Sequence, residues 1–303
     1  MDKLVDLDAL NPRARLRRLM AEPGLIMAPG VADAMFARIV AQRGFKTVYM
    51  TGAGTSAVRL GMPDVGLLTA TEMIDNAGRI ADSSGLSVIA DADNGYGGVL
   101  NVRRTVQGYE RAGVAAIHLE DQVMPKRCGH LAGKELVGAD EMVSKIKAAC
   151  DARVDQDFVI IARTDAIAVE GFDAAIERAE RYREAGADML FVEAPGAGQV
   201  GEVAPRLNFP LLYNMAASGK TPFLGKEEIE RLGYKLAIYP NWIILAAIRA
   251  AGAMLDMLRD KGSIAEAVPN VASFREFFDL MGMPEVQALE ATYAVNEATR
   301  IGY

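Results

Sequence analysis

The sequence predicts an α/β protein, a (β/α)8 barrel of the TIM type with extra C-terminal helices. Eight short runs rich in Val, Ile and Leu recur along the chain, and none is long enough to form a helix by itself. Continuous apolar runs of this length suit strands that are buried on both faces, as in a parallel sheet. Segments with helical spacing lie between most of them, and eight strands that alternate with helices form a barrel.

The expected strands and helices follow one another along most of the chain. Segments 70–85 (ATEMIDNAGRIADSSG) and 172–188 (FDAAIERAERYREAGAD) place apolar residues with the period of a helix that packs one face against a sheet. The expected strands are 25–29 (LIMAP), 46–52 (KTVYMTG), 87–93 (SVIADAD), 115–121 (AAIHLED), 158–164 (FVIIART), 188–195 (DMLFVEAP), 210–215 (PLLYNM) and 236–240 (LAIYP).

Glycines mark the expected junctions between a helix and the next strand. Five helical segments run into a glycine shortly before an apolar run, and glycine tolerates the left-handed conformation that closes a helix. An open, doubly wound sheet is the alternative, but the turn after the first strand, APGVADAM (28–35), lacks the glycine-rich dinucleotide-binding fingerprint. The five junction glycines are Gly44, Gly85, Gly113, Gly186 and Gly233.

We expect residues 1–303 to form a single domain, in which 257–303 is a helical extension beyond the completed barrel. No linker or break in composition precedes that extension. The apolar residues of FREFFDLMGM (274–283) and ALEATYAV (288–295) need a cover, and a second subunit is a reasonable candidate.

The composition is that of an ordinary globular protein, with 51% hydrophobic and 24% charged residues. The net charge is −7, and the basic cluster RARLRR (13–18) is more typical of a solvated helix face than of a nucleic-acid-binding patch. Two cysteines cannot build a disulfide framework, which favours a reducing compartment, the cytoplasm. The first residues lack the apolar stretch of a secretory signal, and no apolar run is long enough to span a membrane.

Polar side chains gather where the apolar runs end, which is the place where a barrel carries its chemistry. One acidic residue at a strand end would mean little, but carboxylates at the ends of three strands, with an arginine and an asparagine, indicate one polar pocket. In chain order the runs end in Tyr49, Thr51 and Gly52; Asp91 and Asp93; Glu120 and Asp121; Arg163 and Asp165; Glu193; and Asn214.

Asp91 and Asp93 are the strongest indication of a metal site. They are two residues apart, so both side chains point to the same side of a strand, and a glycine-rich turn, 94–98 (NGYGG), follows them. Clustered carboxylates repel one another unless a cation lies among them, and oxygen ligands suit Mg²⁺, or Mn²⁺ as a substitute. His118, inside the fourth run, is expected to be a core residue rather than a ligand.

The stretch EDQVMPKRCGH (120–130) holds one of the two cysteines and one of the two histidines of the chain. Cys128 follows Lys126 and Arg127 and precedes Gly129. Positive charges near a thiol favour its reactive form, and glycine lets a loop move. By itself the pattern fits a basic surface loop about equally well, but its place directly after the fourth strand favours a thiol that acts as a proton donor or a nucleophile.

Four motifs, in this order, resemble the isocitrate lyase and phosphoenolpyruvate mutase superfamily: DADNGYGG (91–98), IHLEDQVMPKRCGH (117–130), IARTDA (161–166) and LFVEAP (190–195). The resemblance runs from about Ala28 to the end of the chain. The KRCGH loop is typical of the carbon–carbon lyase branch, in particular of 2,3-dimethylmalate and 2-methylisocitrate lyases. The resemblance implies a (β/α)8 barrel whose last helix is exchanged between neighbouring subunits, a homotetramer built from such dimers, and Mg²⁺.

The resemblance also implies roles for single residues. Asp93 is expected to bind Mg²⁺ directly, and Asp91 and Glu120 directly or through water. The turn Thr51–Gly52–Ala53 corresponds to the S-G-G turn of the family. Its amides are expected to hold the α-carboxylate of the substrate. The other expected substrate contacts are Asp64, Gly129, Arg163, Glu193 and Asn214, and the expected catalytic residues are Cys128, Lys126, His130, Arg163 and Tyr49.

The chemistry that the resemblance implies is the cleavage of a small 2-hydroxy dicarboxylate, such as a substituted malate, to a 2-keto acid (pyruvate) and a carboxylate. A base removes the proton of the C2 hydroxyl, and Cys128 is expected to protonate the fragment that leaves as an enolate-like carboxylate. Mg²⁺ and Arg163 are expected to stabilise the developing negative charge. The base stays open between Tyr49 and a loop or water-mediated group.

Three positions bear on which branch of the family the chain resembles most. Asn94 stands where the lyases commonly carry Thr, and Leu245 stands where 2-methylisocitrate lyases carry an arginine for the extra carboxylate. An apolar residue cannot pair a third carboxylate, which favours an alkyl-substituted malate. Pro240 argues against the oxaloacetate hydrolases, which look to carry a serine nearby. The alternatives are a 2-methylisocitrate lyase, a carboxyphosphonoenolpyruvate-type phosphonomutase, an oxaloacetate hydrolase or decarboxylase, and a barrel that binds a small acid without turnover.

Overall fold

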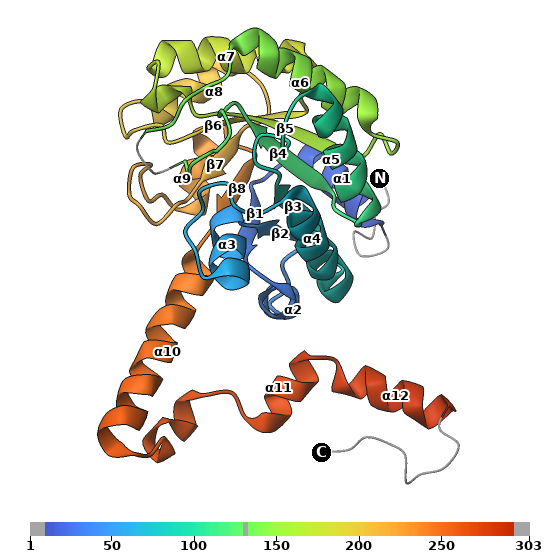
Figure 1. Ribbon diagram of the computed structural model, residues 1–303, viewed down its shortest axis with the longest axis vertical. Coiled ribbons are helices and arrows are strands. Elements are labelled where there is room, and N and C mark those ends of the chain that lie inside the picture. Colours follow the sequence, from blue (N-terminus) through green and yellow to red (C-terminus); the bar gives the residue numbers. More distant parts are fainter. Residues whose placement is uncertain (1–9, 130–132, 294–303) are drawn as a thin grey trace. The chain divides into compact units, whose positions relative to one another are not determined.

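The structure, a computed structural model, describes residues 10–129 and 133–293. In this part of the chain, eight parallel strands pair in the order β6-β5-β4-β3-β2-β1-β8-β7, with helices around them (Figure 1). The strands are β1 Ile26–Val31, β2 Thr47–Met50, β3 Ser87–Asp91, β4 Ala116–Glu120, β5 Val159–Thr164, β6 Met189–Val192, β7 Leu212–Asn214 and β8 Leu236–Tyr239.

The two ends of this sheet meet between β6 and β7. Leu190 forms a parallel bridge with Leu211, and the Leu190 amide donates a hydrogen bond of 3.0 Å to the Pro210 carbonyl. The sheet therefore closes on itself almost completely, and the predicted (β/α)8 barrel is confirmed.

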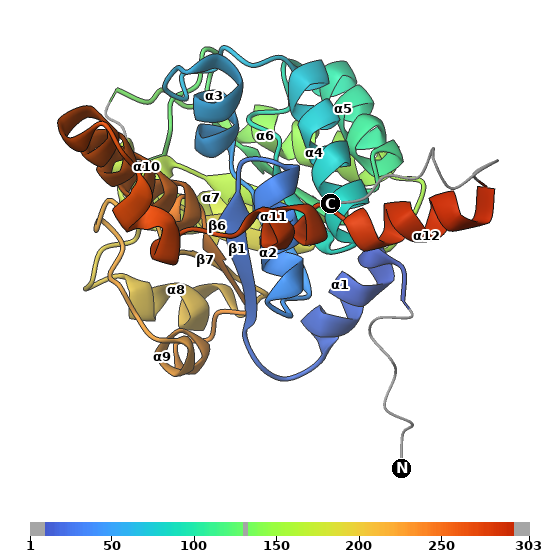
Figure 2. The same cartoon turned by 90° about the horizontal axis from the view of Figure 1, so that it is seen from below.

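The helices of the barrel begin and end close to where the sequence predicted. Segment 70–85 forms α4 and segment 172–188 contains α7, and all five junction glycines have positive φ, between 63° and 108°. Figure 2 shows these helices arranged around the strands. They are α1 Pro12–Ala21, α2 Ala34–Gln42, α3 Gly52–Leu60, α4 Ala70–Ser84, α5 Val99–Arg111, α6 Ala139–Ala152, η1 Ala166–Ala168, α7 Phe172–Glu184, α8 Val200–Leu207 and α9 Lys226–Arg231.

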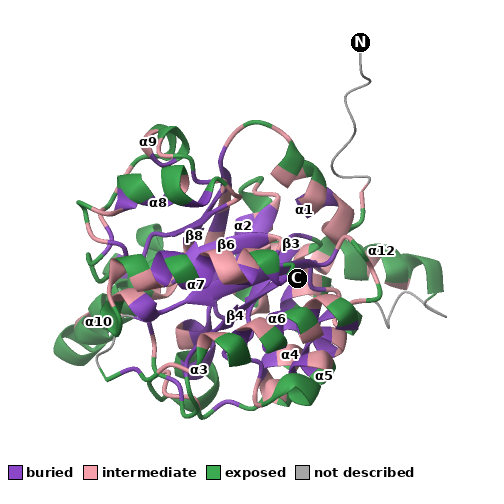
Figure 3. Ribbon diagram, turned by 90° about the horizontal axis from the view of Figure 1, so that it is seen from above, coloured by how far each residue is buried: buried purple, intermediate pink, exposed green. Residues whose placement is uncertain are grey.

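Two apolar clusters make up the core, one between the strands and the surrounding helices and one inside the barrel. The buried strands lie at the centre of Figure 3. Ile89, Ile161 and Phe191 belong to the inner cluster, and Leu16 of α1 packs against it. Because side chains fill the interior and α1 covers one end, small molecules can enter only at the other end, where the polar strand ends lie.

The arginines of α1 hold this helix in place, which corrects the expectation of a solvated basic face. Arg15 is buried and donates to the Gly85 carbonyl at 2.7 Å. Arg13 donates to the Val114 carbonyl at 3.1 Å, and Arg17 donates to the Phe158 carbonyl at 3.1 Å. Three of the four arginines are therefore structural, because their guanidinium groups satisfy backbone carbonyls of the barrel, while Arg18 is exposed and pairs with Glu22.

The chain divides into two compact units, Met1–Ile244 and Leu245–Tyr303. The second unit begins ahead of residue 257, the start that the sequence suggested for the extension. Its helical segments are most of α10 (Trp242–Lys261), together with η2 (Ala265–Asn270), α11 (Phe274–Leu280) and α12 (Met283–Tyr293). Helices α10, α11 and α12 bury none of their described residues.

None of the helices in residues 10–129 and 133–293 combines the length and the apolar character that are needed to cross a membrane.

Candidate active site

A pocket lies at the C-terminal ends of the strands. It brings together most of the residues that the sequence proposed, from seven different strand ends and loops. The predicted residues that line it are Tyr49, Thr51, Ala53, Asp64, Asp91, Glu120, Lys126, Cys128, Gly129, Arg163, Glu193 and Asn214.

Three predicted residues do not line this pocket in the described structure. Gly52 packs against Asp91, so closely that a β-carbon at position 52 would overlap the Asp91 carboxylate. Asp93 lies just behind the pocket, where its amide donates to Asp91 Oδ1 at 3.0 Å. His130 lies outside the described residues.

The turn after Asp93 depends on Asn94, one of the positions at which the chain departs from the family pattern. Asn94 Nδ2 donates to the Gln122 carbonyl at 3.1 Å, and its Oδ1 accepts the Tyr96 amide at 3.0 Å. Asp93 and Tyr96 both have positive φ, 47° and 60°. Since such φ values are strained for residues other than glycine, the two Asn94 bonds hold a turn that the backbone alone would not favour.

The expected carboxylate-binding turn is the first turn of a helix. Thr51 is the N-cap of α3, and its Oγ1 accepts the Gly54 amide at 3.3 Å. The first amides of a helix have no carbonyl partner inside the helix and carry partial positive charge. The amide of Ala53, which lines the pocket together with Arg163, therefore offers a donor to a bound anion at the start of α3.

Lys126 lies among the carboxylates rather than on an exposed basic loop. Its Nζ is 2.6 Å from Asp93 Oδ1 and 2.7 Å from Asp64 Oδ1, and the side chain is 2% exposed. Burial, together with the charges of Asp91 and Asp64, raises the pKa of Asp93 to about 7 in spite of Lys126. One lysine therefore does not neutralise this cluster.

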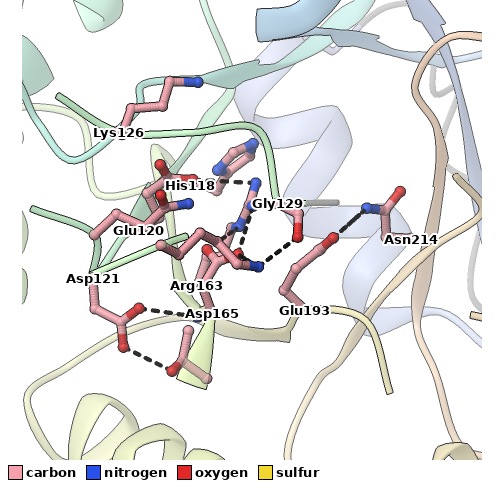
Figure 4. Close-up of polar contacts among 12 residues, drawn as sticks. His118, Glu120, Asp121, Lys126, Gly129, Arg163, Asp165, Glu193 and Asn214 are labelled. Atoms are coloured by element: carbon pink, nitrogen blue, oxygen red, sulfur yellow. Dashed lines mark hydrogen bonds and ion pairs between the residues drawn. The ribbon is translucent and has the colours of Figure 1, made fainter. Parts of the chain in front are cut away.

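Arg163 is the centre of a second ionic network (Figure 4). Its guanidinium binds Asp165 through two hydrogen bonds, of 3.0 and 3.1 Å, and Nη1 lies 3.3 Å from Glu120 Oε2. The same group stacks on the Phe191 ring, 5.0 Å from its centroid. Although burial opposes ionisation, Arg163 and Lys134 lower the pKa of Asp165 to about 2.

Glu193 and Gly129 complete the wall around Arg163. Asn214 Nδ2 donates to Glu193 Oε2 at 3.1 Å, as Figure 4 shows. A β-carbon at position 129 would overlap both the Arg163 guanidinium and the Glu193 carboxylate. The loop that carries Cys128 thus lies against the Arg163 guanidinium, and any larger residue at position 129 would force Arg163 and Glu193 to shift.

Sequence reasoning missed Lys134, which anchors this loop. Its buried Nζ lies 2.8 Å from Asp165 Oδ1 and also donates to the Gly129 carbonyl. Lys134 therefore connects the Cys128 loop to the carboxylate that orients Arg163. No periodicity indicates this contact, because Lys134 and Asp165 are 31 residues apart and belong to different loops.

His118 is buried, as expected for a core residue, but it also contacts the site. Its Nε2 lies 2.9 Å from the Tyr49 hydroxyl and 3.7 Å from Asp91 Oδ1. Burial lowers the pKa of His118 to about 4, so the ring is neutral near pH 7. The two-residue spacing to Glu120, which puts both side chains on one face of β4, could have indicated this position.

A model of the phosphoenolpyruvate phosphomutase family matches residues 16–259. The chain belongs to this family. The 2,3-dimethylmalate lyase of Eubacterium barkeri is 47% identical over 94% of this chain and 99% of the relative.

Two solved structures of related proteins have the same fold. A 2,3-dimethylmalate lyase, described as a member of the PEP mutase/isocitrate lyase superfamily, aligns with a TM-score of 0.90 and 37% identity over 97% of this chain and 99% of that chain. An oxaloacetate acetylhydrolase in complex with 3,3-difluorooxalacetate aligns with a TM-score of 0.89 and 39% identity over the same shares. The predicted superfamily is therefore confirmed.

In this member of the phosphoenolpyruvate phosphomutase family, the site is suited to a cation. Glu120 Oε1 is buried and has no hydrogen-bond partner among the described residues, and burial raises the pKa of Glu120 well above its usual range. No three acidic, histidine or cysteine side chains of the described chain already form a complete set of metal ligands. Acidic side chains nevertheless outnumber basic ones around the pocket: Asp64, Asp91, Asp93, Glu120, Asp165 and Glu193 against Lys126, Lys134 and Arg163.

Proposed function

We propose that the protein is a lyase that depends on a divalent cation and cleaves a small 2-hydroxy dicarboxylate, a substituted malate such as 2,3-dimethylmalate, to pyruvate and a carboxylate. The observation that carries this proposal is the position of Cys128 in the same pocket as Arg163 and the start of α3. A thiol that can donate a proton there faces two groups that bind carboxylates. The identity of 47% with a 2,3-dimethylmalate lyase supports the same reaction.

The walls of the pocket favour a small substrate with alkyl groups. Ala53, Ala216 and Pro240 line it together with the polar residues, and among the described residues Lys126 and Arg163 are the only basic side chains in its lining. Two carboxylates can therefore bind, at Arg163 and at the α3 amides, while methyl groups meet apolar walls. A third carboxylate would find no further basic partner among the described residues of the pocket, which disfavours a tricarboxylate.

Different residues of the chain serve different steps of the proposed reaction. The C2 hydroxyl gives its proton to a base, its oxygen forms a carbonyl, and the C2–C3 bond breaks with its electrons on C3. Arg163 stabilises the negative charge that develops, and Cys128 donates a proton to C3. Burial raises the pKa of Tyr49 well above its usual value, so the Tyr49 hydroxyl stays protonated and orients the substrate, with His118 as its partner.

We further propose that Asp91, Asp93 and Glu120 hold the cation, Mg²⁺ or Mn²⁺ in its place. The surplus of carboxylates and the unpaired Glu120 Oε1 support this choice. When bound, such a cation would polarise a substrate oxygen and offset negative charge.

Pyruvate release from a panel of acids tests the reaction. We expect the purified protein with Mg²⁺ to release pyruvate from 2,3-dimethylmalate faster than from 2-methylisocitrate, since only the latter carries a third carboxylate. 2-Methylmalate, whose cleavage would also release pyruvate but which lacks the 3-methyl group, is the matched control for that group. Oxaloacetate tests the hydrolase alternative, which the likeness to an oxaloacetate acetylhydrolase favours. Oxalate release from oxaloacetate, without pyruvate from any malate, would refute the lyase.

We propose a homotetramer built from dimers that exchange their C-terminal helices. Leu245, Ile248, Leu255 and Leu258 of α10 are exposed apolar residues, and a helix with so many of them is unstable in water without a partner. We expect sedimentation equilibrium at micromolar concentration to give the mass of four chains. A single-chain mass at that concentration would contradict the proposal.

We place the enzyme in the cytoplasm. The chain has two cysteines, Cys128 and Cys150, and neither forms a disulfide, as suits a reducing compartment.

A further inference from the structure

Asn241 lies in the loop between β8 and α10, directly after Pro240, and lines the same pocket as Thr51 and Ala53. The Thr51 hydroxyl donates a hydrogen bond of 3.0 Å to Asn241 Oδ1. A side-chain amide carries its oxygen and its NH2 group on the two arms of one planar carbon. The contact with Thr51 therefore orients both arms of the Asn241 amide.

The hydrogen bonds of Thr51 leave it unable to donate to a substrate. A threonine hydroxyl has one proton, and here Asn241 Oδ1 accepts it. The same hydroxyl oxygen accepts the Gly54 amide at 3.3 Å, which caps α3. The family resemblance suggested that Thr51 replaces the serine hydroxyl of the carboxylate-binding turn, but in this chain the hydroxyl proton is already engaged.

The NH2 group of Asn241, unlike the Thr51 hydroxyl, still has protons available to donate. It carries two protons, and no hydrogen bond from them to an acceptor is found among the described residues of the chain. Ala53, Ala216 and Pro240, the apolar residues that line the same pocket, offer no side-chain acceptor. The first amides of α3, at Gly52 and Ala53, are donors as well, so a carboxylate bound at the start of α3 would meet the Asn241 NH2 group as a further donor.

We infer that Asn241, and not the Thr51 hydroxyl, is the side-chain donor to the carboxylate that binds at the start of α3. Thr51 acts as a positioning residue that holds the Asn241 amide with its NH2 group available. The inference rests on the proposed function for the identity of the substrate as a dicarboxylate. It also defines the chemistry that the site accepts, a carboxylate or another oxygen acceptor rather than an ammonium group.

Binding of oxalate to the full-length protein in Mg²⁺ buffer, measured by calorimetry, tests this without turnover. Oxalate is a planar pair of carboxylates that resembles the enolate of a 2-keto acid. Asn241→Leu keeps the approximate shape of the side chain and removes the donors, and we expect oxalate binding to weaken by about tenfold or more. Asn241→Asp, which keeps the oxygen for Thr51 and replaces the NH2 group by an anionic oxygen, should weaken it further.

Thr51→Val is the matched comparison, because it keeps the shape of the side chain and replaces the hydroxyl, which also accepts the Gly54 amide, by a methyl group. We expect Thr51→Val to lose less oxalate affinity than Asn241→Leu does. For Asn241→Leu we also expect KM for the malate substrate to rise by a larger factor than kcat falls. A melting curve for each variant verifies that it folds. If Asn241→Leu does not fold, the oxalate affinity of Asn241→Asp tests the inference instead. Oxalate affinity that is unchanged in Asn241→Leu, or that falls more in Thr51→Val, overturns the inference.

Failure of this inference and failure of the lyase proposal give different results. If the wild type cleaves no malate but Asn241→Leu loses oxalate affinity, the lyase proposal falls and the role of Asn241 stands. If the wild type cleaves a malate and Asn241→Leu does so with an unchanged KM, the lyase stands and the role of Asn241 falls.

Discussion

Replacing Cys128 with alanine should lower kcat for the best substituted malate by about 10²–10⁴-fold, the usual loss when a positioned proton donor is removed. Cys128 lines the pocket, and its amide donates to the Asp64 carbonyl at 3.2 Å, so the backbone of the loop is held independently of the thiol. Stability should therefore change little. Cys128→Ser keeps the size but is a far weaker acid, and we expect a loss of similar order.

Cys150→Ala is the matched control for this experiment. Cys150 belongs to α6, where its Sγ donates to the Gly186 carbonyl at 3.1 Å, and it does not line the pocket. We expect this variant to keep wild-type kcat. Steady-state rates and melting temperatures of all three variants decide the outcome. Wild-type kcat in Cys128→Ala would refute the proton-donor role and would favour the mutase or binding alternatives.

Removing divalent cations with a chelator should abolish turnover, and Mg²⁺ or Mn²⁺ should restore it. The physical reason is the surplus of buried carboxylates around the pocket, which Lys126 and Arg163 do not balance. Full turnover in excess chelator would remove the cation from the mechanism.

Among the proposed ligands, Asp93→Ala should weaken cation binding more than Asp91→Ala does. Asp91 Oδ1 already accepts the Asp93 amide, whereas Asp93 Oδ1 contacts the ammonium group of Lys126, a positive charge that a cation can replace. Calorimetric titration with Mg²⁺ measures both affinities. Asp155→Asn is the control, because Asp155 pairs with Arg13 away from the pocket and should leave Mg²⁺ affinity unchanged.

The sequence alone determined the barrel and the end at which its chemistry lies. Buried parallel strands need continuous apolar runs, and a helix that closes with a left-handed residue needs glycine, so both features leave local patterns that are visible without a structure. Strand direction is the same for every strand in such a barrel. Polar residues at the ends of several runs, such as Asp91, Glu120 and Arg163, therefore had to meet at one end.

The tertiary structure alone decided which of these polar residues pair with one another. Asn241 accepts the Thr51 proton across 190 residues, and Lys134 joins the Cys128 loop to Asp165. Similarly, the arginines of α1 satisfy backbone carbonyls that no sequence pattern assigns to them. A hydrogen bond depends on distances of a few tenths of an ångström between single atoms, and these distances are set only when loops distant in the chain pack together. Periodicity reports which face of an element is buried, but not which donor on one loop meets which acceptor on another.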